Sequence, residues 1–405
     1  MSGSRWLMVA VLIAGAFTTA LNIALISPLV TAIAAEFGRS EAAAGQVATL
    51  TATASALTAL AVAPWMDRWP RRVWLRIEAG LLTVGTLISV LAPGFGWLLA
   101  GRTVAGIGGA VIFGTCIAAT GDLFPDQAIR NRMFGLVITA ATVAGLIGLP
   151  VLTQIEAHAG WRWAMASILI PLAVVLLGTR WLPGGGTKSS GSAMAEWWSG
   201  YRAVLSRSET LWMLGLMVAQ AFVWFGWIIY LGAFAEEVFG MGAGLISLLF
   251  LIGSGGDVLG SNLGPVLVRR WKPRRIATVV SGILAAGLFG VGFDFVDVTT
   301  LIVLAAITGL AGGVLFVCTN ILMLDSFPEG RGVVMSLQSA GLEVGGALGT
   351  AAFGAALALS DSYTASYRLL GVAALASLVC LAMSARPARE PEISVDGTVV
   401  VSAEP

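Results

Sequence analysis

GIGGAVIFGTCIAATGDLFP, residues 106–125, is repeated at residues 309–328 as GLAGGVLFVCTNILMLDSFP, without a gap and at a shift of 203 positions. The alignment pairs Gly106 with Gly309, Phe113 with Phe316, Asp122 with Asp325 and Pro125 with Pro328. A weaker match pairs PWMDRWPRR (64–72) with PVLVRRWKPRR (265–275). Parallel repeats of this length indicate a duplicated architecture, and such architectures commonly place their site between the two halves.

The composition indicates the surroundings of the chain. Of its 405 residues, 57% are hydrophobic and 11% are charged, and the mean hydropathy is +0.89. A soluble domain has no core large enough to bury so much apolar surface, so we expect an integral membrane protein in contact with the lipid bilayer. The net charge of +1 argues against nucleic acid as a partner.

Twelve apolar stretches are long enough to cross a bilayer, which takes about 20 residues of helix. They lie near residues 6–33, 42–65, 73–92, 96–120, 132–155, 162–182, 210–234, 243–268, 274–295, 299–323, 332–359 and 364–384. The sequence therefore predicts an all-α membrane protein with twelve transmembrane helices in two pseudo-symmetric six-helix bundles. Its predicted parts are an N-terminal bundle (1–182), a cytoplasmic linker (183–209), a C-terminal bundle (210–385) and a disordered cytoplasmic tail (386–405).

Basic residues predict the orientation of these spans. Most of the 23 Lys and Arg residues fall on the side that includes both chain ends, and the opposite side has only Arg39, Arg162 and Arg368. Because basic loops stay in the cytoplasm, both termini are expected there. Lys188 and Lys272 are the only lysines, and such an excess of Arg hints at a GC-rich bacterial genome. We therefore expect a monomeric, multi-pass protein of the bacterial cytoplasmic (inner) membrane.

The loop APWMDRWPRR (63–72), after the second span, resembles a motif of the major facilitator superfamily. It has Ala63 and Pro70 in place of two glycines of that motif and keeps its charged residues, Asp67, Arg68, Arg71 and Arg72. The resemblance implies a conformational latch, in which charge-assisted hydrogen bonds hold helix ends together in one state and release them in another. Asp67 would meet Arg331 at the start of span 11, and Arg71 would meet Asp122 at the end of span 4. Alternatively, the arginines only set the topology.

Two further stretches lie within predicted spans and resemble the same superfamily. LLAGRTVAGIGGA (98–110) is similar to a motif with a membrane arginine, here Arg102. AGLIGLPVLTQIEAHAGWRWAM (144–165) is similar to the antiporter motif, with Gly145, Gly148 and Pro150 as its helix-packing residues. The resemblance extends over nearly the whole chain and is to twelve-span efflux permeases of the arabinose-efflux-like and drug:proton antiporter groups.

Two carboxylates lie deep within predicted spans. Asp257, in LIGSGGDVLGSN (251–262), is twelve residues from Arg269, which places it about 18 Å into a hydrocarbon layer about 30 Å thick. Glu343 reaches a similar depth in span 11. An ionised carboxylate there costs at least about 2.5 to 3.5 kcal/mol, so each should face a wet cavity, pair with a cation or stay protonated. Both are predicted to line a cavity and to bind protons. The alternative is a buried acid held by serines on the same helical face: Ser254 and Ser261 for Asp257, Ser336 and Ser339 for Glu343.

The resemblance implies a substrate cavity lined chiefly by spans 1, 4, 7 and 10. The polar and aromatic residues predicted there are Thr18, Asn22, Ser27, Arg102, Gln220, Trp224, Trp227, Tyr230, Phe316 and Asn320. Asn22 stands where many relatives have an acid, so proton coupling is assigned to Asp257 and Glu343, together with Arg102. Aromatic walls with few charges suit an amphipathic or weakly polar solute. The tryptophans could instead pack between helices.

Catalysis and metal binding find no support in the sequence. His158 is the one histidine, and Cys116, Cys318 and Cys380 are too far apart for a zinc site. We therefore predict no enzyme activity, no cofactor and no metal. No nucleotide-binding loop is recognisable, which argues against ATP as the energy source.

The predicted function is secondary active transport by alternating access, as proton-coupled efflux of a small-molecule solute such as a drug, sugar or metabolite. Two alternatives stay open. The first is an importer of the same fold, either a symporter or a facilitator. The second is a membrane receptor or scaffold that transports nothing.

Overall fold

The fold is a bundle of long helices. The computed structural model describes residues 3–62, 65–66, 69–124, 126–182, 202, 205–292, 297–326 and 331–384. Within these residues, twelve helical segments are long and apolar enough to cross a membrane, as the sequence predicted. The tail predicted at 386–405 and most of the predicted linker at 183–209 lie outside the described residues.

Each half of the chain supplies six of these spans. The first half contains α1 (Gly3–Ala24), η1 (Ser27–Leu29), α2 (Val30–Phe37), α3 (Glu41–Val62), α4 (Arg71–Val90), α5 (Phe95–Gly109), α6 (Ile112–Leu123), α7 (Gln127–Val143), the π-helix η3 (Ala144–Gly148), α8 (Leu149–Ala159), α9 (Trp161–Ala166), α10 (Leu169–Gly178) and η4 (Thr179–Trp181). The second half contains α12 (Ser208–Phe239), α13 (Ala243–Val268), α14 (Pro273–Val291), α15 (Val298–Ser326), α16 (Arg331–Ser360) and α17 (Tyr363–Met383).

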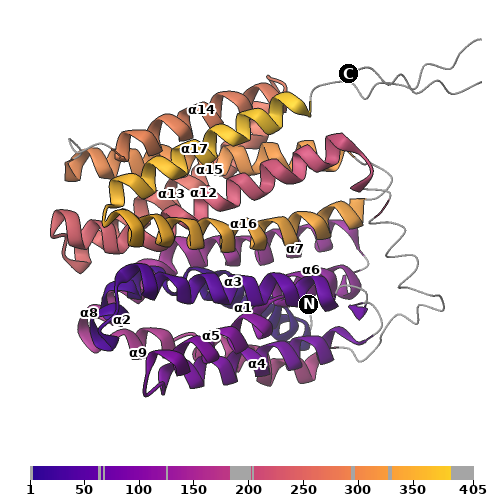
Figure 1. Ribbon diagram of the computed structural model, residues 1–405. Helices are drawn as coiled ribbons and strands as arrows, with labels where there is room; N and C mark the ends of the chain where they lie inside the picture. The colour runs from indigo at the N-terminus through magenta and orange to yellow at the C-terminus, as the bar shows by residue number, and fades with distance from the viewer. Residues whose placement is uncertain are drawn as a thin grey trace, which may run out of the picture.

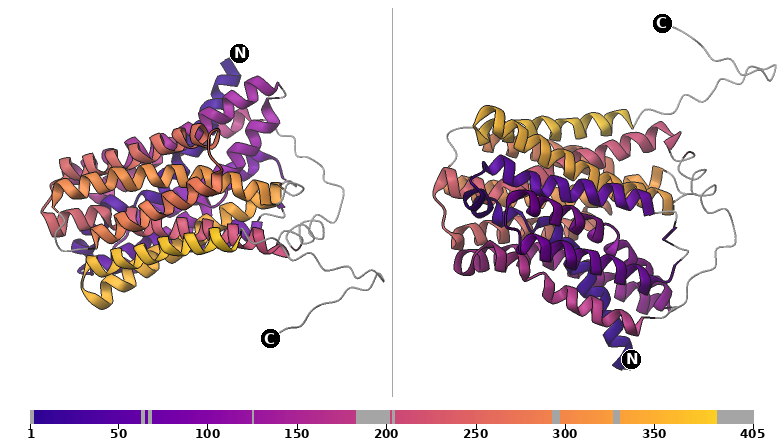
Figure 2. Two further views of the ribbon diagram at one scale, coloured as in Figure 1. Left: turned by 90° about the horizontal axis from the view of Figure 1, so that it is seen from above. Right: turned by 60° about the horizontal axis from the view of Figure 1, so that its bottom comes forward.

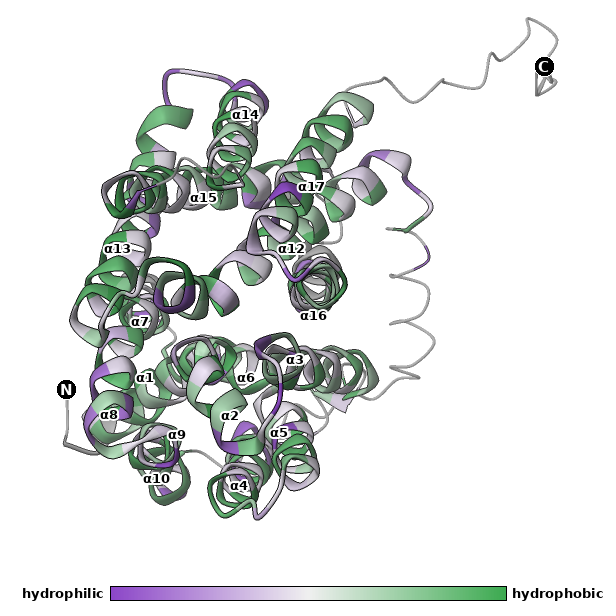
Figure 3. Ribbon diagram, turned by 60° about the vertical axis from the view of Figure 1, so that its left-hand side comes forward, coloured by the Kyte–Doolittle hydropathy of each residue, from purple (hydrophilic) through white to green (hydrophobic). Residues whose placement is uncertain are grey.

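The two halves form two layers (Figure 1), and Figure 3 shows the same halves one above the other, seen from the side on which α2 and α8 lie. We call the end where α1 begins and α17 ends the terminal face, and the opposite end the far face. Short helix α2 and the end of α8 lie at the far face (Figures 1 and 2). Apolar side chains cover much of the outer surface, as a lipid environment requires.

Close packing at glycines repeats between the halves. A methyl group added at Gly106 would lie 2.3 Å from the carbonyl oxygen of Thr51, and one added at Gly309 would lie 2.1 Å from that of Gly253. Gly106 and Gly309 are equivalent in the repeat. At the same shift of 203 positions, Thr51 is equivalent to residue 254, which is next to Gly253. The fourth span of each half therefore packs on the second span in the same way, because small residues allow the backbones to approach.

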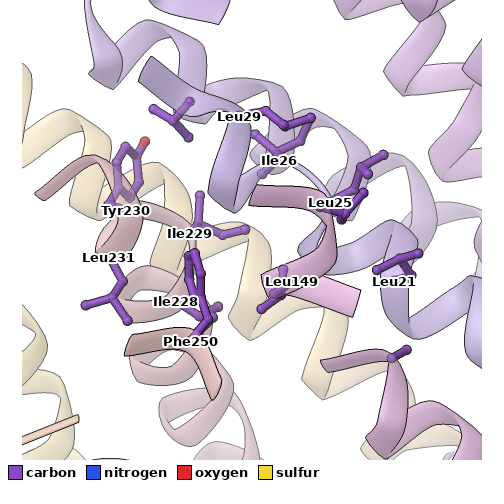
Figure 4. Close-up of a cluster of buried hydrophobic side chains, with 14 of the residues drawn as sticks. Leu21, Leu25, Ile26, Leu29, Leu149, Ile228, Ile229, Tyr230, Leu231 and Phe250 are labelled. Carbon is purple, nitrogen blue, oxygen red and sulfur yellow. The ribbon is translucent and has the colours of Figure 1, made fainter. Parts of the chain in front are cut away.

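The halves meet along a seam made by two helix pairs. Helix α3 packs on α16, and α8 with η3 packs on α13. The first pair joins the second span of the first half to the fifth span of the second half. The other pair joins the fifth span of the first half to the second span of the second half, as a two-fold relation between the halves requires. Part of the seam is apolar (Figure 4), and its fully buried side chains include Leu25, Ile26 and Leu29 from the first half and Ile228, Ile229 and Phe250 from the second.

Hydrogen bonds across the seam gather toward the far face. Ser27 donates to the carbonyl oxygen of Ile228. The Tyr230 hydroxyl donates to the carbonyl oxygen of Ala42 over 3.4 Å. Nε2 of Gln154 lies 2.8 Å from Oγ of Ser247. Among the residues described, these bonds tie the far ends of the two halves together.

The first span is shorter than the sequence indicated. The apolar run near 6–33 is divided, because α1 ends at Ala24 and a turn leads into η1 and α2. Pro28 lies at the break, and its missing N–H group and its ring are poorly tolerated inside a helix. The chain beyond Ala24 therefore lies at the far face rather than in the first span.

Candidate functional site

Asp257 lies where α13 and α15 cross at their closest. A methyl group added at Gly313 would lie 2.1 Å from the carbonyl oxygen of Asp257, and one added at Gly260 would lie 2.1 Å from that of Leu310. Only glycine fits at such a crossing. The neighbouring Gly312 also leaves room for the carboxylate, because an added methyl group would lie 3.9 Å from Oδ1 of Asp257. The glycine-rich stretch thus positions the charge against α15.

The Asp257 side chain borders a cavity of about 220 Å³ inside the second half. All six spans of that half contribute to its wall, through Gln220, Ala221, Val223, Trp224, Phe225, Asp257, Leu284, Gly312, Phe316, Leu342 and Ala374. Of these described lining residues, Asp257 alone is charged. The rest of the wall is mainly apolar and aromatic, as in many small-molecule sites. We call this space the second-half cavity.

Gln220 gives the second-half cavity a second polar group. Its Nε2 donates to the carbonyl oxygen of Gly312 over 3.3 Å, which fixes the orientation of the amide. Its Oε1 is buried and has no hydrogen-bond partner. A buried amide oxygen without a partner is costly, so this acceptor remains available to a ligand.

A smaller cavity lies at the seam and is bordered by Glu343. Its volume of about 20 Å³ has room for about one water molecule. Its polar lining residues are Asn22, Thr51 and Ser55 from the first half and Glu343 and Thr350 from the second. Ser55 of α3 and Glu343 of α16 border the same space, so this carboxyl group faces the first half. We call this space the seam cavity.

Arg102 stands behind the seam cavity and is completely buried. Its Nη2 donates to Oδ1 of Asn22 over 2.9 Å and to the carbonyl oxygen of Asn22 over 3.1 Å. Its Nε donates to Oγ1 of Thr51 over 3.3 Å, and its Nη1 has no hydrogen-bond partner. Asn22 and Thr51 both border the seam cavity. Arg102 and Glu343 therefore lie on opposite sides of the same polar region.

Phe225 borders both cavities, so one side chain of α12 contributes a wall to each. A carboxyl group lies on either side of it, Asp257 in the second-half cavity and Glu343 in the seam cavity. The two acids therefore face different spaces, although sequence spacing placed them at a similar depth in the same bundle.

Comparison with known proteins agrees with this architecture. The sequence profile described as Major Facilitator Superfamily matches residues 12–293 and 281–399. The chain belongs to the major facilitator superfamily. The superfamily assignment makes it a membrane transporter of small-molecule solutes rather than an enzyme.

Individual members of the superfamily are similar to this chain at modest identity. AraJ of Escherichia coli is 24% identical over 87% of this chain and 89% of its own length. A chloramphenicol resistance protein of Streptomyces lividans is 26% identical over 65% of this chain and 67% of its own length. A chloramphenicol efflux pump of Mycobacterium tuberculosis is 28% identical over 32% of this chain and 31% of its own length.

Solved structures of the same fold include a bacterial homologue of the human lysosomal transporter Spinster. In its inward-facing, unoccupied conformation it superposes with a TM-score of 0.74 at 18% identity, covering 95% of this chain and 96% of the other. The occupied inward-facing form gives 0.73 at 17% identity, over 95% and 97% of the two chains.

Several residues predicted to line a central facilitator-superfamily cavity lie in the packed interior. The Thr18 hydroxyl donates to the carbonyl oxygen of Ala14 in its own helix. Ser27 and Tyr230 make the seam hydrogen bonds described above, and Tyr230 stacks on Phe353 with ring centroids 4.6 Å apart. Trp227 is buried and contacts Trp224 with ring centroids 5.6 Å apart. Asn320, by contrast, is partly exposed and accepts a hydrogen bond from Gln338.

Part of the latch motif can be placed. Nε of Arg71 lies 3.1 Å from Oδ2 of Asp122, and Nη1 of Arg71 donates to the carbonyl oxygen of Met66 over 2.8 Å. The Arg72 side chain is exposed. Asp67, Arg68 and the side chain of Arg331 lie outside the described part of the chain. The Arg71–Asp122 pair joins two helices of the first half at the terminal face, and its release during transport stays a prediction.

The antiporter motif contains the π-helix. A methyl group added at Gly148 would lie 2.5 Å from Cδ1 of Leu21, whereas nothing lies within 4 Å of one added at Gly145. The carbonyl oxygen of Pro150 accepts a hydrogen bond from Ser247 across the seam over 3.3 Å. π-Helical turns are frequent at functional positions and are easily rearranged.

Glu78 is a buried carboxylate that the sequence reasoning did not single out. It lies in α4 and is 3% exposed. Its Oε2 accepts a hydrogen bond from Thr115 over 3.4 Å, and its Oε1 has no partner. Its place in the apolar run 73–92 is the signal that identified Asp257, so the same argument applied to α4 would have found it. Among the described residues, His, Cys, Asp and Glu form no group of three suited to a metal.

Proposed function

We propose that this chain is a proton-coupled exporter that works by alternating access on a small amphipathic or weakly polar organic solute. The observation that carries the proposal is the second-half cavity, in which Asp257 is the one charged group among the described lining residues. Coupling of a solute to protons requires a titratable group whose protonation changes the binding of the solute, and a group in the solute cavity does this directly. Asp257 meets this requirement in a cavity with mainly apolar walls.

The cost of burying a charge supplies the coupling. A carboxylate within the membrane must be neutralised by a proton or compensated by another group. Bound solute and bound proton can each stabilise the site, and each would favour a different facing of the transporter. Loss of one then promotes binding of the other, so that proton and solute exchange.

Glu343 is proposed as the second proton-coupling residue because it lies where the halves must move past each other. It shares the seam cavity with Ser55 of the first half, and Arg102 has an unpartnered nitrogen beyond Asn22 and Thr51. Rocking of α16 against α3 would change the water and the positive charge that Glu343 meets. Phe225 borders both cavities, which allows the occupancy of one to affect the other.

Export is proposed because two of the relatives are named as a chloramphenicol efflux pump and a chloramphenicol resistance protein. One proton crossing about 100 mV releases about 2.3 kcal/mol, and each pH unit adds about 1.4 kcal/mol. This energy sustains a solute gradient of roughly ten- to several-hundredfold. The Lys and Arg distribution supports a location in the bacterial cytoplasmic membrane with both termini in the cytoplasm.

Everted membrane vesicles test coupling and direction together. When these vesicles are energised so that their lumen is acidic, an exporter coupled to protons accumulates solute inside. We expect accumulation of at least one member of a panel of uncharged and singly charged amphipathic solutes that includes chloramphenicol. Collapse of the pH gradient should abolish it. Accumulation only in right-side-out vesicles would identify an importer instead.

Variants assign the coupling residues. Asp257→Asn should abolish pH-driven accumulation, and Glu343→Gln should weaken it. Asp297→Asn is the matched control, because Asp297 is exposed before α15 and accepts the N–H of Thr300, a role that Asn also fills. Accumulation that survives unchanged in folded Asp257→Asn would contradict the proposed role of Asp257.

A further inference from the structure

Two polar groups of the second-half cavity offer hydrogen-bond acceptors to a ligand. Asp257 contributes a carboxyl group, and Gln220 contributes an Oε1 atom without a partner. One of the two N–H groups of the Gln220 amide is already bonded to Gly312. No Lys, Arg or His occurs among the described lining residues, so the site offers negative potential and lacks a positive counterpart. A ligand that donates hydrogen bonds and carries positive charge complements this wall.

The aromatic side chains of the cavity also favour a positively charged ligand. Trp224 and Phe225 from α12 and Phe316 from α15 all border it. The faces of aromatic rings carry negative electrostatic potential and attract cations, most strongly for Trp. Trp224 is held by its contact with Trp227, so it forms part of a fixed wall. These rings also provide flat apolar surface for an aromatic group of the ligand.

The volume of the second-half cavity limits the size of its ligand. Its 220 Å³ fall below the range of about 300–1,000 Å³ that is typical for drug-sized ligands. A single ring with a short substituent fits this space better than a larger drug molecule does.

We infer that the second-half cavity selects a small aromatic organic cation, whose ammonium group binds between Asp257 and the Oε1 atom of Gln220. This inference rests on the proposed function, since it names the solute class of the proposed transport site. The ammonium group and a proton compete for one carboxylate, so binding of the cation strengthens as pH rises. The groups that face Asp257 from the surrounding helices, Gln220, Trp224, Leu284, Phe316 and Leu342, do not titrate in the physiological range.

Calorimetric titration of the purified full chain in detergent tests the inference with three probes that share a phenyl ring and a short chain. 2-Phenylethylamine is a cation near neutral pH, 2-phenylethanol is neutral and 3-phenylpropanoate is an anion. We expect the cation to bind at least about tenfold more tightly than the alcohol, and the anion to bind weakest. The affinity for the cation should rise between pH 6 and pH 8, and that for the alcohol should not rise in parallel.

Variants test which residues recognise the cation. Asp257→Asn should remove the preference for the cation while leaving the binding of 2-phenylethanol, and Gln220→Leu should weaken binding of the cation. Asp297→Asn should keep the preference. Retained binding of the alcohol in Asp257→Asn shows that the cavity is intact, so a loss of preference cannot be attributed to unfolding.

Three outcomes would overturn the inference: equal or tighter binding of the alcohol or the anion, an unchanged preference for the cation in Asp257→Asn, or no binding of any probe up to about 10 mM. These equilibrium measurements need neither a membrane nor a pH gradient. Selective cation binding without pH-driven transport would therefore contradict only the proposed function. Transport without cation selectivity would contradict only the inference about the solute.

Discussion

Replacement of Gly313 by alanine tests whether the glycine crossing of α13 and α15 positions Asp257. The new methyl group would lie 2.1 Å from the carbonyl oxygen of Asp257, 2.7 Å from the backbone nitrogen of Ser261 and 2.9 Å from the carbonyl carbon of Asp257. All three are backbone atoms, so no side-chain rotation relieves the clash. Ordinary contact begins at 3.4 Å, so the backbones would have to part by about 1.3 Å. Overpacking of this kind costs about 1–3 kcal/mol.

The matched control is Gly282→Ala in α14, where nothing lies within 4 Å of an added methyl group. Alanine favours a helix over glycine by about 1 kcal/mol, and this control has that gain without the clash. Unfolding by SDS in mixed micelles, followed by tryptophan fluorescence, measures the free energy of unfolding. We expect Gly313→Ala to be less stable than wild type by about 1–3 kcal/mol and Gly282→Ala to be at least as stable as wild type. Equal stability of the two variants would refute the account of the crossing.

Three further predictions concern the ends of the bundle and the π-helix. The Arg162 guanidinium holds the pKa of Glu36 below its ordinary value of about 4.5, so their pair stabilises the fold near neutral pH and loses this contribution as pH falls below that value. Glu36→Gln should therefore unfold more easily than wild type near neutral pH, and the difference should shrink as pH falls below about 4.5; a difference of unchanged size in acid would contradict this. Asp122→Asn should change the free energy of unfolding by less than about 1 kcal/mol, since the Asp122 side chain is 57% exposed, yet it should slow transport; unchanged transport would argue against the latch. Gly145→Ala should be stable in the present conformation, where the added methyl group meets nothing; a transport defect would then indicate a close contact in the other conformation.

The twelve spans could be predicted because length and hydropathy decide whether a helix can cross a bilayer. What hydropathy does not register is a break inside an apolar run. The chain leaves the first span after Ala24 although residues 25–33 are mostly apolar. The turn depends on Pro28 and on the hydrogen bond that Ser27 donates to the carbonyl oxygen of Ile228. The repeat predicted equivalent packing of the halves, and the contacts of Gly106 and Gly309 reproduce it.

The site could be predicted only in part. The cost of a buried charge singled out Asp257 and Glu343 in the sequence, and each of them borders a cavity in the structure. Spacing does not give the neighbouring helix that each side chain meets, so it did not separate the second-half cavity from the seam cavity. Leu284 and Phe225 border these spaces but have no chemical signal in the sequence. Glu78, in contrast, is a carboxylate inside an apolar run and could have been predicted in the same way as Asp257.

The most direct test of the central claim, that protons exchange with solute at Asp257, is proton movement in proteoliposomes that enclose a pH-sensitive dye. Chloramphenicol and benzyltrimethylammonium are suitable probes, because neither carries a proton across by itself near neutral pH. The account predicts that an imposed gradient of a transported probe changes the lumenal pH with wild type and with Asp297→Asn, and leaves it unchanged with folded Asp257→Asn. Probe movement without any proton movement in wild type, or undiminished proton movement in Asp257→Asn, would contradict the account.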